Sequence, residues 1–501
     1  MMRKNTIIVF YLLVCLLTMA LWSCTDGKQR ELNRLLVELA DEDATIDGGD
    51  WQQIMDFLDA NKAHFKQFFD NGSVKTDEVK EYVSDLFEHR RPPKEIMFVG
   101  IGGKETLNVK FYLERSGSML PYDAPGGDGS LKSAVVQLLN NLPGKDNRLF
   151  VVNDGVHAYP KGIDEFVRSV NIFESTKGIG DASYTDFGRI FRELLEHTGE
   201  DELSVLVSDM IYSTREMAGV NPTKVFADAQ GMTQAVFKDE TRRRAMLVAK
   251  LSGSYNGPYY PYDQPKGGTS YNGQRPYYIV VVGSNANIRR LTTDANYASF
   301  SRFTSLRGFE HMMLFGSDEI YKPYYSLLLS GKDIRGRFSP ERGQPDRITA
   351  IEGVKPDKDS GDIRLALAVD LSGLLIEDDY LADVSNYKVE SAAGFSIKEI
   401  RKVERDDATP AEKKYLKGAT HIFVLEGSEL RTNEELEIKL LNHLPAWVAQ
   451  SSTDDDRNTA AAGFAQTTFG LKYLMQGIYD AYARHAKDEP CYFEIELKLK
   501  K

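Results

Sequence analysis

Between residues 96 and 325, short apolar runs alternate with segments of helical periodicity, and this alternation limits the possible folds of the 501-residue chain more than any other feature. The runs "LNVKFYL", "RLFVVN" and "LSVLVSD" are largely apolar on both faces, and patterns typical of helices lie at 186–197 and 222–244. Strands without a polar face are typical of a sheet that helices cover on both sides. We therefore predict an α/β fold, with a doubly wound, mostly parallel sheet in a domain of residues 96–335.

The regions on either side have other periodicities. Residues 24–95 place apolar side chains at helical spacing in "LNRLLVELA", "WQQIMDFLDANKAHFKQFF" and "VKEYVSDLF", which predicts an N-terminal helical region that ends at "RRPP". After residue 339, "DIRLALAVDL" and "CYFEIELKLK" carry large apolar residues at alternate positions, as half-buried, mostly antiparallel strands do. With one amphipathic helix in "FGLKYLMQGIYDAYARHA", these strands predict a β-rich α+β domain over residues 340–501.

Residues 1–23 have the pattern of a signal peptide. Arg3 and Lys4 precede an uncharged apolar run that ends in "LWSC" at Cys24. This ending resembles the lipobox of bacterial lipoproteins. The resemblance implies that residues 1–23 are removed, that Cys24 is acylated, and that the lipid anchors the protein in the bacterial cell envelope. The outer membrane is the expected location, and the periplasmic and surface faces both stay open. An uncleaved N-terminal anchor helix is the alternative.

Charge and cysteine content narrow the class of partner. The formal net charge is −12, and it becomes −14 without residues 1–23, which contain two basic residues and no acidic ones. Binding to nucleic acid depends on Lys and Arg opposite the phosphates, so we do not expect a nucleic acid partner. Outside the signal segment only Cys24 and Cys491 remain, so a lipidated Cys24 leaves no intrachain disulfide.

Oxygen-bearing side chains follow three predicted structural elements of the sheet domain. Glu114, Ser116 and Ser118 lie at the end of the first strand, Thr185 lies in the loop "GIGDASYTDF", and Asp209 ends the strand "SVLVSD". Ligands of open parallel sheets bind at the carboxyl ends of the strands. Two carboxylates with neutral hydroxyls, and without His or Cys, suit a hard cation such as Mg²⁺. Each residue taken alone could equally cap a helix.

This combination resembles the von Willebrand factor type A (vWA) domain with its metal-ion-dependent adhesion site. In that family Asp-x-Ser-x-Ser follows the first strand, a Thr lies in a later loop, and an Asp ends the fourth strand. Ser116, Ser118, Thr185 and Asp209 match the pattern, and Glu114 replaces its first Asp. The resemblance implies a bound Mg²⁺, or Mn²⁺ or Ca²⁺ in its place, that a carboxylate of a partner protein completes. Glu is longer than Asp by about 1.5 Å, and Mg²⁺ tolerates little error in ligand distance, so a metal-free relic of the site is the alternative.

A tyrosine-rich segment, residues 255–278, joins two predicted strands of the same domain. Tyr among Gly, Pro and Asn is typical of recognition loops. If the strand before this segment runs parallel to the first strand, the segment leaves the sheet at the edge that carries the metal ligands. Its candidate partner contacts are Tyr259, Tyr260, Tyr262 and Tyr271. The alternative is that these tyrosines pack on their own protein. Elsewhere, "STDDDRN" at 452–458 favours a solvated turn over a calcium site.

These observations lead to one functional expectation and two alternatives. We expect a lipid-anchored cell-envelope protein that is not an enzyme and binds a partner protein through a vWA-like domain. The first alternative is a metal-free structural subunit of an envelope assembly. The second is a hydrolase with Ser116 as nucleophile, for which the sequence supplies no nucleophile-elbow pattern and no assigned base.

Overall fold

The computed structural model describes residues 27–501 except 41–43, 47, 71–72, 92, 95, 99–105, 184, 213–219, 265–266, 317–320 and 485–488. The chain divides into two compact units, residues 1–104 and 105–501. The predicted signal segment and Cys24 lie outside the described residues.

The first unit is helical, as its periodicity predicts. A helix at 27–40 packs with α2 (Gly48–Ala60) and α3 (Thr76–Glu88) around one apolar core that includes Leu36, Ile54 and Val83. Two short strand pairs complete the unit. They are β1 (Thr45–Ile46) with β4 (Met97–Phe98), and β2 (Phe69–Asp70) with β3 (Ser73–Val74).

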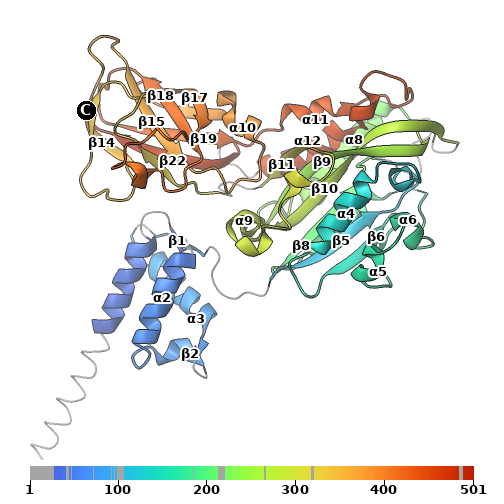
Figure 1. Ribbon diagram of the computed structural model, residues 1–501, viewed down its shortest axis with the longest axis horizontal. Coiled ribbons are helices and arrows are strands. Elements are labelled where there is room, and N and C mark those ends of the chain that lie inside the picture. The colour runs from blue at the N-terminus through green and yellow to red at the C-terminus, as the bar shows by residue number, and fades with distance from the viewer. Residues whose placement is uncertain are drawn as a thin grey trace, which may run out of the picture. The chain divides into compact units, whose positions relative to one another are not determined.

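The second unit contains a seven-stranded sheet with the strand order β11-β9-β10-β8-β5-β6-β7 (Figure 1). Its strands are β5 (Asn108–Glu114), β6 (Arg148–Val152), β7 (Val156–Ala158), β8 (Glu202–Ser208), β9 (Arg244–Tyr259), β10 (Thr269–Ser284) and β11 (Phe309–Phe315). The α/β class predicted from the sequence is therefore confirmed. The sheet is mixed rather than mostly parallel as predicted: β8, β5 and β6 run parallel, whereas the pairs β6–β7, β8–β10, β10–β9 and β9–β11 are antiparallel.

The antiparallel half of the sheet has a physical origin in the tyrosine-rich segment. Parallel neighbours need a crossover connection, usually a helix. The described residues between β9 and β10 form no helix, and both strands pair with each other from Arg244 opposite Ser284 to Tyr259 opposite Thr269. Because β8 and β9 are each antiparallel to β10, β9 points in the same direction as β5 and β8. The tip of this β9–β10 hairpin therefore lies at the edge where β5 and β8 end.

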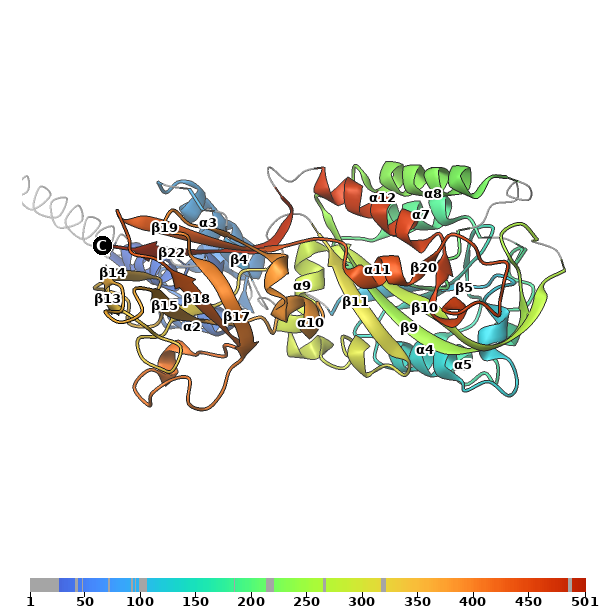
Figure 2. The same cartoon turned by 90° about the horizontal axis from the view of Figure 1, so that it is seen from above.

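Helices cover both faces of the sheet (Figure 2). On one face, α4 (Ser130–Asn140) and α9 (Asn285–Thr293) pack on the odd-numbered side chains of the central strands, such as Phe111 and Val205. On the other face, α7 (Phe187–His197) and α8 (Pro222–Phe237) pack on even-numbered ones, such as Tyr112 and Leu206. Two short helices, α5 (Ile163–Val167) and α6 (Ile172–Ser175), follow β7.

The C-terminal region forms two facing sheets, as strict alternation predicts. Tyr387 of one sheet packs against Phe423 of the other, with ring centroids 5.1 Å apart. One sheet has the order β12 (Tyr325–Leu327), β15 (Ile363–Val369), β18 (His421–Gly427), β17 (Ser396–Lys402). The other has the order β13 (Arg337–Pro340), β14 (Ala350–Lys355), β22 (Cys491–Leu499), β19 (Glu434–Leu441), β16 (Tyr387–Glu390), and only its β14–β22 pair is parallel.

Residues 446–483, predicted to lie in the C-terminal domain, pack instead on the seven-stranded sheet. This segment contains α11 (Ala446–Gln450), β20 (Ser452–Thr453), a 3-10 turn η7 (Phe464–Gln466), β21 (Thr468–Phe469) and α12 (Leu471–Ala483). α12 lies beside α8 in both views (Figures 1 and 2), and Met475 and Ile478 join the core of the α7–α8 face. The apolar stripe of α12 identified a helix but could not identify the surface that buries it.

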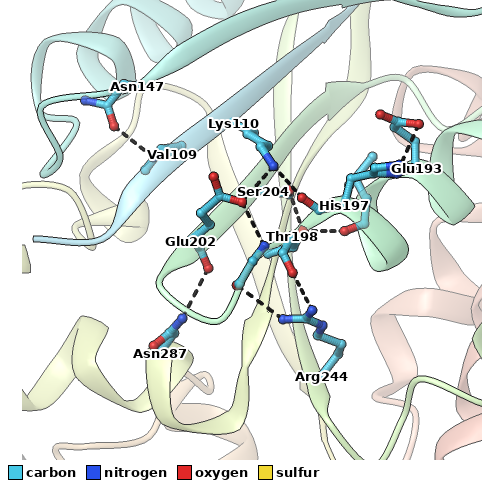
Figure 3. A network of polar contacts seen from close by, with 12 residues as sticks. Val109, Lys110, Asn147, Glu193, His197, Thr198, Glu202, Ser204, Arg244 and Asn287 are labelled. Carbon is cyan, nitrogen blue, oxygen red and sulfur yellow. Dashed lines mark hydrogen bonds and ion pairs between the residues drawn. The ribbon is translucent and has the colours of Figure 1, made fainter. Parts of the chain in front are cut away.

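Hydrogen bonds and an ion pair fasten the edge where β5 and β8 begin (Figure 3). The ammonium of Lys110 lies 2.7 Å from Glu202 Oε2, and Asn287 Nδ2 donates to the carbonyl of Glu202 at 3.2 Å. Arg244, at the start of β9, donates to the carbonyl of Thr198. These charged groups and carbonyls bind one another, so the contacts at this edge stabilise the fold.

Candidate metal centre at the carboxyl edge of the sheet

Glu114 is the last residue of β5, and its carboxylate is buried, with 1% of the residue exposed. Thr185 Oγ1 donates to Glu114 Oε1 at 2.5 Å, and the hydroxyl of Ser208 donates to Glu114 Oε2. Ser208 ends β8, the parallel neighbour of β5, which explains how its hydroxyl reaches Glu114. Both oxygens of this carboxylate are therefore held by hydroxyl groups.

Asp209 directly follows β8 and is also 1% exposed. Its Oδ1 accepts a hydrogen bond from the amide of Ile211 at 3.1 Å, while Oδ2 is buried and has no hydrogen-bond partner among the described residues. Met210, between Asp209 and Ile211 in the sequence, adopts φ 54°, a left-handed conformation that non-glycine residues rarely take.

Ser116 and Ser118 lie between the two carboxylates in the fold. Their hydroxyl oxygens are 2.9 Å apart, and Ser116 is buried. Burial raises the pKa of both carboxyl groups. The Ser116 hydroxyl partly offsets this rise for Glu114, and the Ser118 hydroxyl partly offsets it for Asp209. The four hydroxyl-bearing and acidic side chains predicted at the two strand ends are thus brought together.

The loop that carries Thr185 is fastened to the first strand end. The amide of Gly117 donates to the carbonyl of Ala182 at 2.9 Å, and Asp186 caps α7 by accepting from the amide of Arg189. Thr185 itself is 2% exposed. The structure therefore places all five residues of the sequence-predicted site at one edge of the sheet.

Burial makes this site unfavourable for two negative charges. Burial and the nearby charge of Asp209 together raise the pKa of Glu114 to about 8. Burial likewise raises the pKa of Asp209. A divalent cation would relieve both effects, because it supplies positive charge where solvent is excluded. The unpartnered Asp209 Oδ2 and the neighbouring hydroxyls are oxygen ligands of the kind that Mg²⁺ and Ca²⁺ take.

The tyrosine-rich segment reaches this edge, but most of its tyrosines are packed. Tyr259 is fully buried, and its hydroxyl donates to Asp456 Oδ2 at 2.7 Å. Tyr262 stacks on Phe469 with ring centroids 4.7 Å apart. The interpretation of Tyr259 as a partner contact is therefore wrong for this conformation, because aromatic rings from residues 446–483 bury the hairpin.

Three of the four candidate contacts, Tyr260, Tyr262 and Tyr271, keep some exposure. Tyr271 is half-buried against Phe464, with centroids 5.0 Å apart. Tyr260 is also half-buried, and its ring edge lies beside Gly117, in ordinary contact distance of the position that a Cβ there would take. Tyr260 is thus the tyrosine of this segment that borders the candidate metal centre directly.

Sequence reasoning missed three polar residues around the site. Ser208 lies one residue before Asp209 in the same strand end, and this spacing could have identified it. Arg275 is 1% exposed, although it lies in a segment that resembles a surface loop. Asp456 is 1% exposed as well, so the solvated-turn interpretation is wrong for this residue, whereas Asp455 is exposed and pairs with Arg457.

A second acidic group lies far along the chain. Glu404, Asp406 and Asp407 could bring their carboxylate oxygens within 4.8 Å of one another. Asp407, however, already forms an ion pair with Arg401, which also pairs with Asp333. This cluster is explained by its arginine.

Comparison with known proteins adds no assignment. The chain matches no protein-family model, and no curated protein matches it. Among the described helices, none combines the length and apolar character that a membrane crossing requires.

Proposed function

We propose that this chain is a lipid-anchored protein of the bacterial cell envelope that binds a partner protein at the carboxyl edge of a vWA-like sheet, with a divalent cation at Glu114, Ser116, Ser118, Thr185 and Asp209. Mg²⁺ is the favoured ion. The observation that carries the proposal is the buried Asp209 Oδ2, which has no hydrogen-bond partner in the described part of the chain. A buried carboxylate oxygen without a donor is costly, and a cation would supply the missing interaction.

The strand arrangement supports the vWA resemblance in one half of the sheet. Counted from β5, β8 is the fourth strand, and Asp209 follows it directly. Thr185 lies in the loop before α7, the helix that leads into β8, and so matches the Thr of the family pattern. The β9–β10 hairpin then interrupts the parallel order. The vWA-like assignment therefore rests on β5 to β8 and the residues at their ends.

The metal-free structural subunit remains a second candidate because of Glu114. Burial and the charge of Asp209 raise its pKa to about 8, although the hydroxyls of Thr185 and Ser208 favour the ionised form, so a protonated carboxyl would be stable there without any cation. The hydrolase alternative would assign a reaction to Ser116, and panels of ester, phosphate and glycoside substrates test it directly.

Calorimetry with MgCl₂ and MnCl₂ tests the cation, with Asp209→Ala as the disrupting variant. We expect wild type to bind and to gain thermal stability by mass action. Asp209→Ala should lose most of the affinity, whereas Glu114→Asp should alter it without changing the fold. Asp455→Ala is the matched control, because it removes an exposed carboxylate. Absence of heat and of a stability change in wild type at millimolar metal would favour the metal-free subunit.

Pull-down of partners from envelope fractions tests the second part of the proposal. Wild type and Asp455→Ala should capture the same protein, and Asp209→Ala should lose it when metal is present. Equal capture by all three variants would separate partner binding from the metal site.

A further inference from the structure

Arg275 carries a buried guanidinium that forms no ion pair with any residue in the described part of the chain. It projects from β10, and the residue is 1% exposed. Its guanidinium carbon lies 4.8 Å from the ring centroid of Tyr259 and 4.2 Å from that of Phe464, whose carbonyl accepts a hydrogen bond from Nη1. Within the described residues Nε has no hydrogen-bond partner and no carboxylate pairs with the side chain. A buried charge without a contacting counter-ion is costly.

Strand register places this charge next to the candidate metal centre. β10 pairs with β8 so that Tyr278 lies opposite Ser208. Asp209 is the residue that follows Ser208 at this end of β8, and Arg275 lies three residues before Tyr278 on β10, toward the same edge of the sheet. Burial raises the pKa of Asp209, and the charge of Arg275 opposes that rise.

The same guanidinium acts on a second buried acid. Asp456 accepts hydrogen bonds from the Tyr259 hydroxyl and from the amide of Tyr262, and burial raises its pKa while the charge of Arg275 again opposes the rise. Arg275 therefore stands between two buried acids without contacting either. Since arginine stays protonated in proteins, this positive charge is permanent.

We propose that Arg275 is a fixed counter-charge that weakens divalent-cation binding at Asp209 and makes the occupied site more receptive to an anionic group of the partner. This inference rests on the proposed function. In a site that excludes water, a permanent positive charge repels a second cation over several ångströms, because solvent screens it little. The same charge attracts an anion. Arg275 thus sets the cation concentration at which the site fills, and it contacts no ligand itself.

The test measures Mg²⁺ and Mn²⁺ affinity by calorimetry in wild type, Arg275→Met, Arg275→Lys and Arg244→Met. We expect Arg275→Met to bind about tenfold more tightly than wild type, a change of roughly 1.4 kcal/mol, and Arg275→Lys to stay near wild type. Arg244→Met is the matched control. It removes another buried guanidinium from the same hairpin, at the opposite edge of the sheet (Figure 3), and should leave affinity unchanged.

A second variant keeps the proposal testable if Arg275→Met does not fold. Asp456→Asn preserves side-chain shape and removes a negative charge that partly balances Arg275, so it should weaken Mg²⁺ binding. Circular dichroism and thermal unfolding establish that each variant is folded. Unchanged affinity in Asp456→Asn overturns the counter-charge role.

The outcomes separate this inference from the proposed function. Binding by wild type with equal affinity in Arg275→Met overturns the role of Arg275 and leaves the metal site standing. Binding by Arg275→Met without binding by wild type supports the role of Arg275 and contradicts a cation site that fills in the natural protein. Absence of binding in wild type and in every folded variant overturns both.

Discussion

Thr185 Oγ1 donates a hydrogen bond to Glu114 Oε1 at 2.5 Å, across 71 positions of sequence. Together with the Ser208 hydroxyl, it satisfies both oxygens of Glu114, whereas Asp209 Oδ2 has no partner among the described residues. The two carboxylates of the candidate site are therefore unequal. Glu114 is stable as a neutral acid, and Asp209 is the group that gains most from a cation.

This inequality predicts how stability changes with pH in the metal-free protein. Burial and the charge of Asp209 raise the pKa of Glu114 to about 8 from its ordinary value of 4.5. Between these values the folded state binds more protons than the unfolded state, so the free energy of unfolding falls as pH rises. We expect a loss of at least ~1.4 kcal/mol, the value of one pKa unit, between pH 5 and pH 8, measured by urea unfolding in chelator. Glu114→Gln should flatten this dependence, and an equal slope in both proteins would contradict it.

Tyr259 offers a test of the contact between the hairpin and residues 446–483. Tyr259→Phe removes the hydroxyl that donates to the buried Asp456, so we expect a loss of about 1–3 kcal/mol in the free energy of unfolding. Tyr271→Phe is the control, because that hydroxyl donates to the Gln274 carbonyl in an exposed position at 3.2 Å, and its loss should cost under about 0.5 kcal/mol. Equal effects would mean that Asp456 finds another donor.

Two glycines on facing helices test the packing of α12 on α8. A Cβ at Gly477 would overlap the carbonyl of Gln230 and the hydroxyl of Thr233, so Gly477→Ala must force the helices apart. We expect a loss of more than about 2 kcal/mol. Gly231→Ala on α8 meets no atom within 4 Å and should stabilise by about 0.5–1 kcal/mol, because alanine favours helix. Thermal unfolding of both variants provides the comparison, and a stabilised Gly477→Ala would contradict this packing.

The lipid anchor is a prediction from the sequence. Replacement of Cys24 by Ser should abolish acylation and release the protein from membranes, as followed by metabolic labelling with a fatty acid and by fractionation. Cys491→Ser is the matched control and should remain membrane-bound. Membrane recovery and labelling of Cys24→Ser at wild-type levels would rule out the lipoprotein assignment.

The local elements and the composition of the candidate site could be predicted from the amino-acid sequence. Apolar runs and helical periodicity located β5, β6 and β8 and predicted the helix realised as α7, because strand and helix periods are visible in a single segment. The positions after strand ends then predicted which oxygens would meet, since parallel strands bring their carboxyl ends to one edge.

The residues that surround those oxygens could not be predicted without the three-dimensional fold. Burial of Arg275 and Asp456 depends on rings and strands far away in sequence, and a charged residue beside tyrosines has the same local pattern on a surface as in a core. The direction of β10 and the packing position of α12 could not be predicted from the sequence either. An apolar face shows that something must cover it, but the choice of cover depends on which surfaces of the whole chain fit together, and periodicity contains no information on that fit.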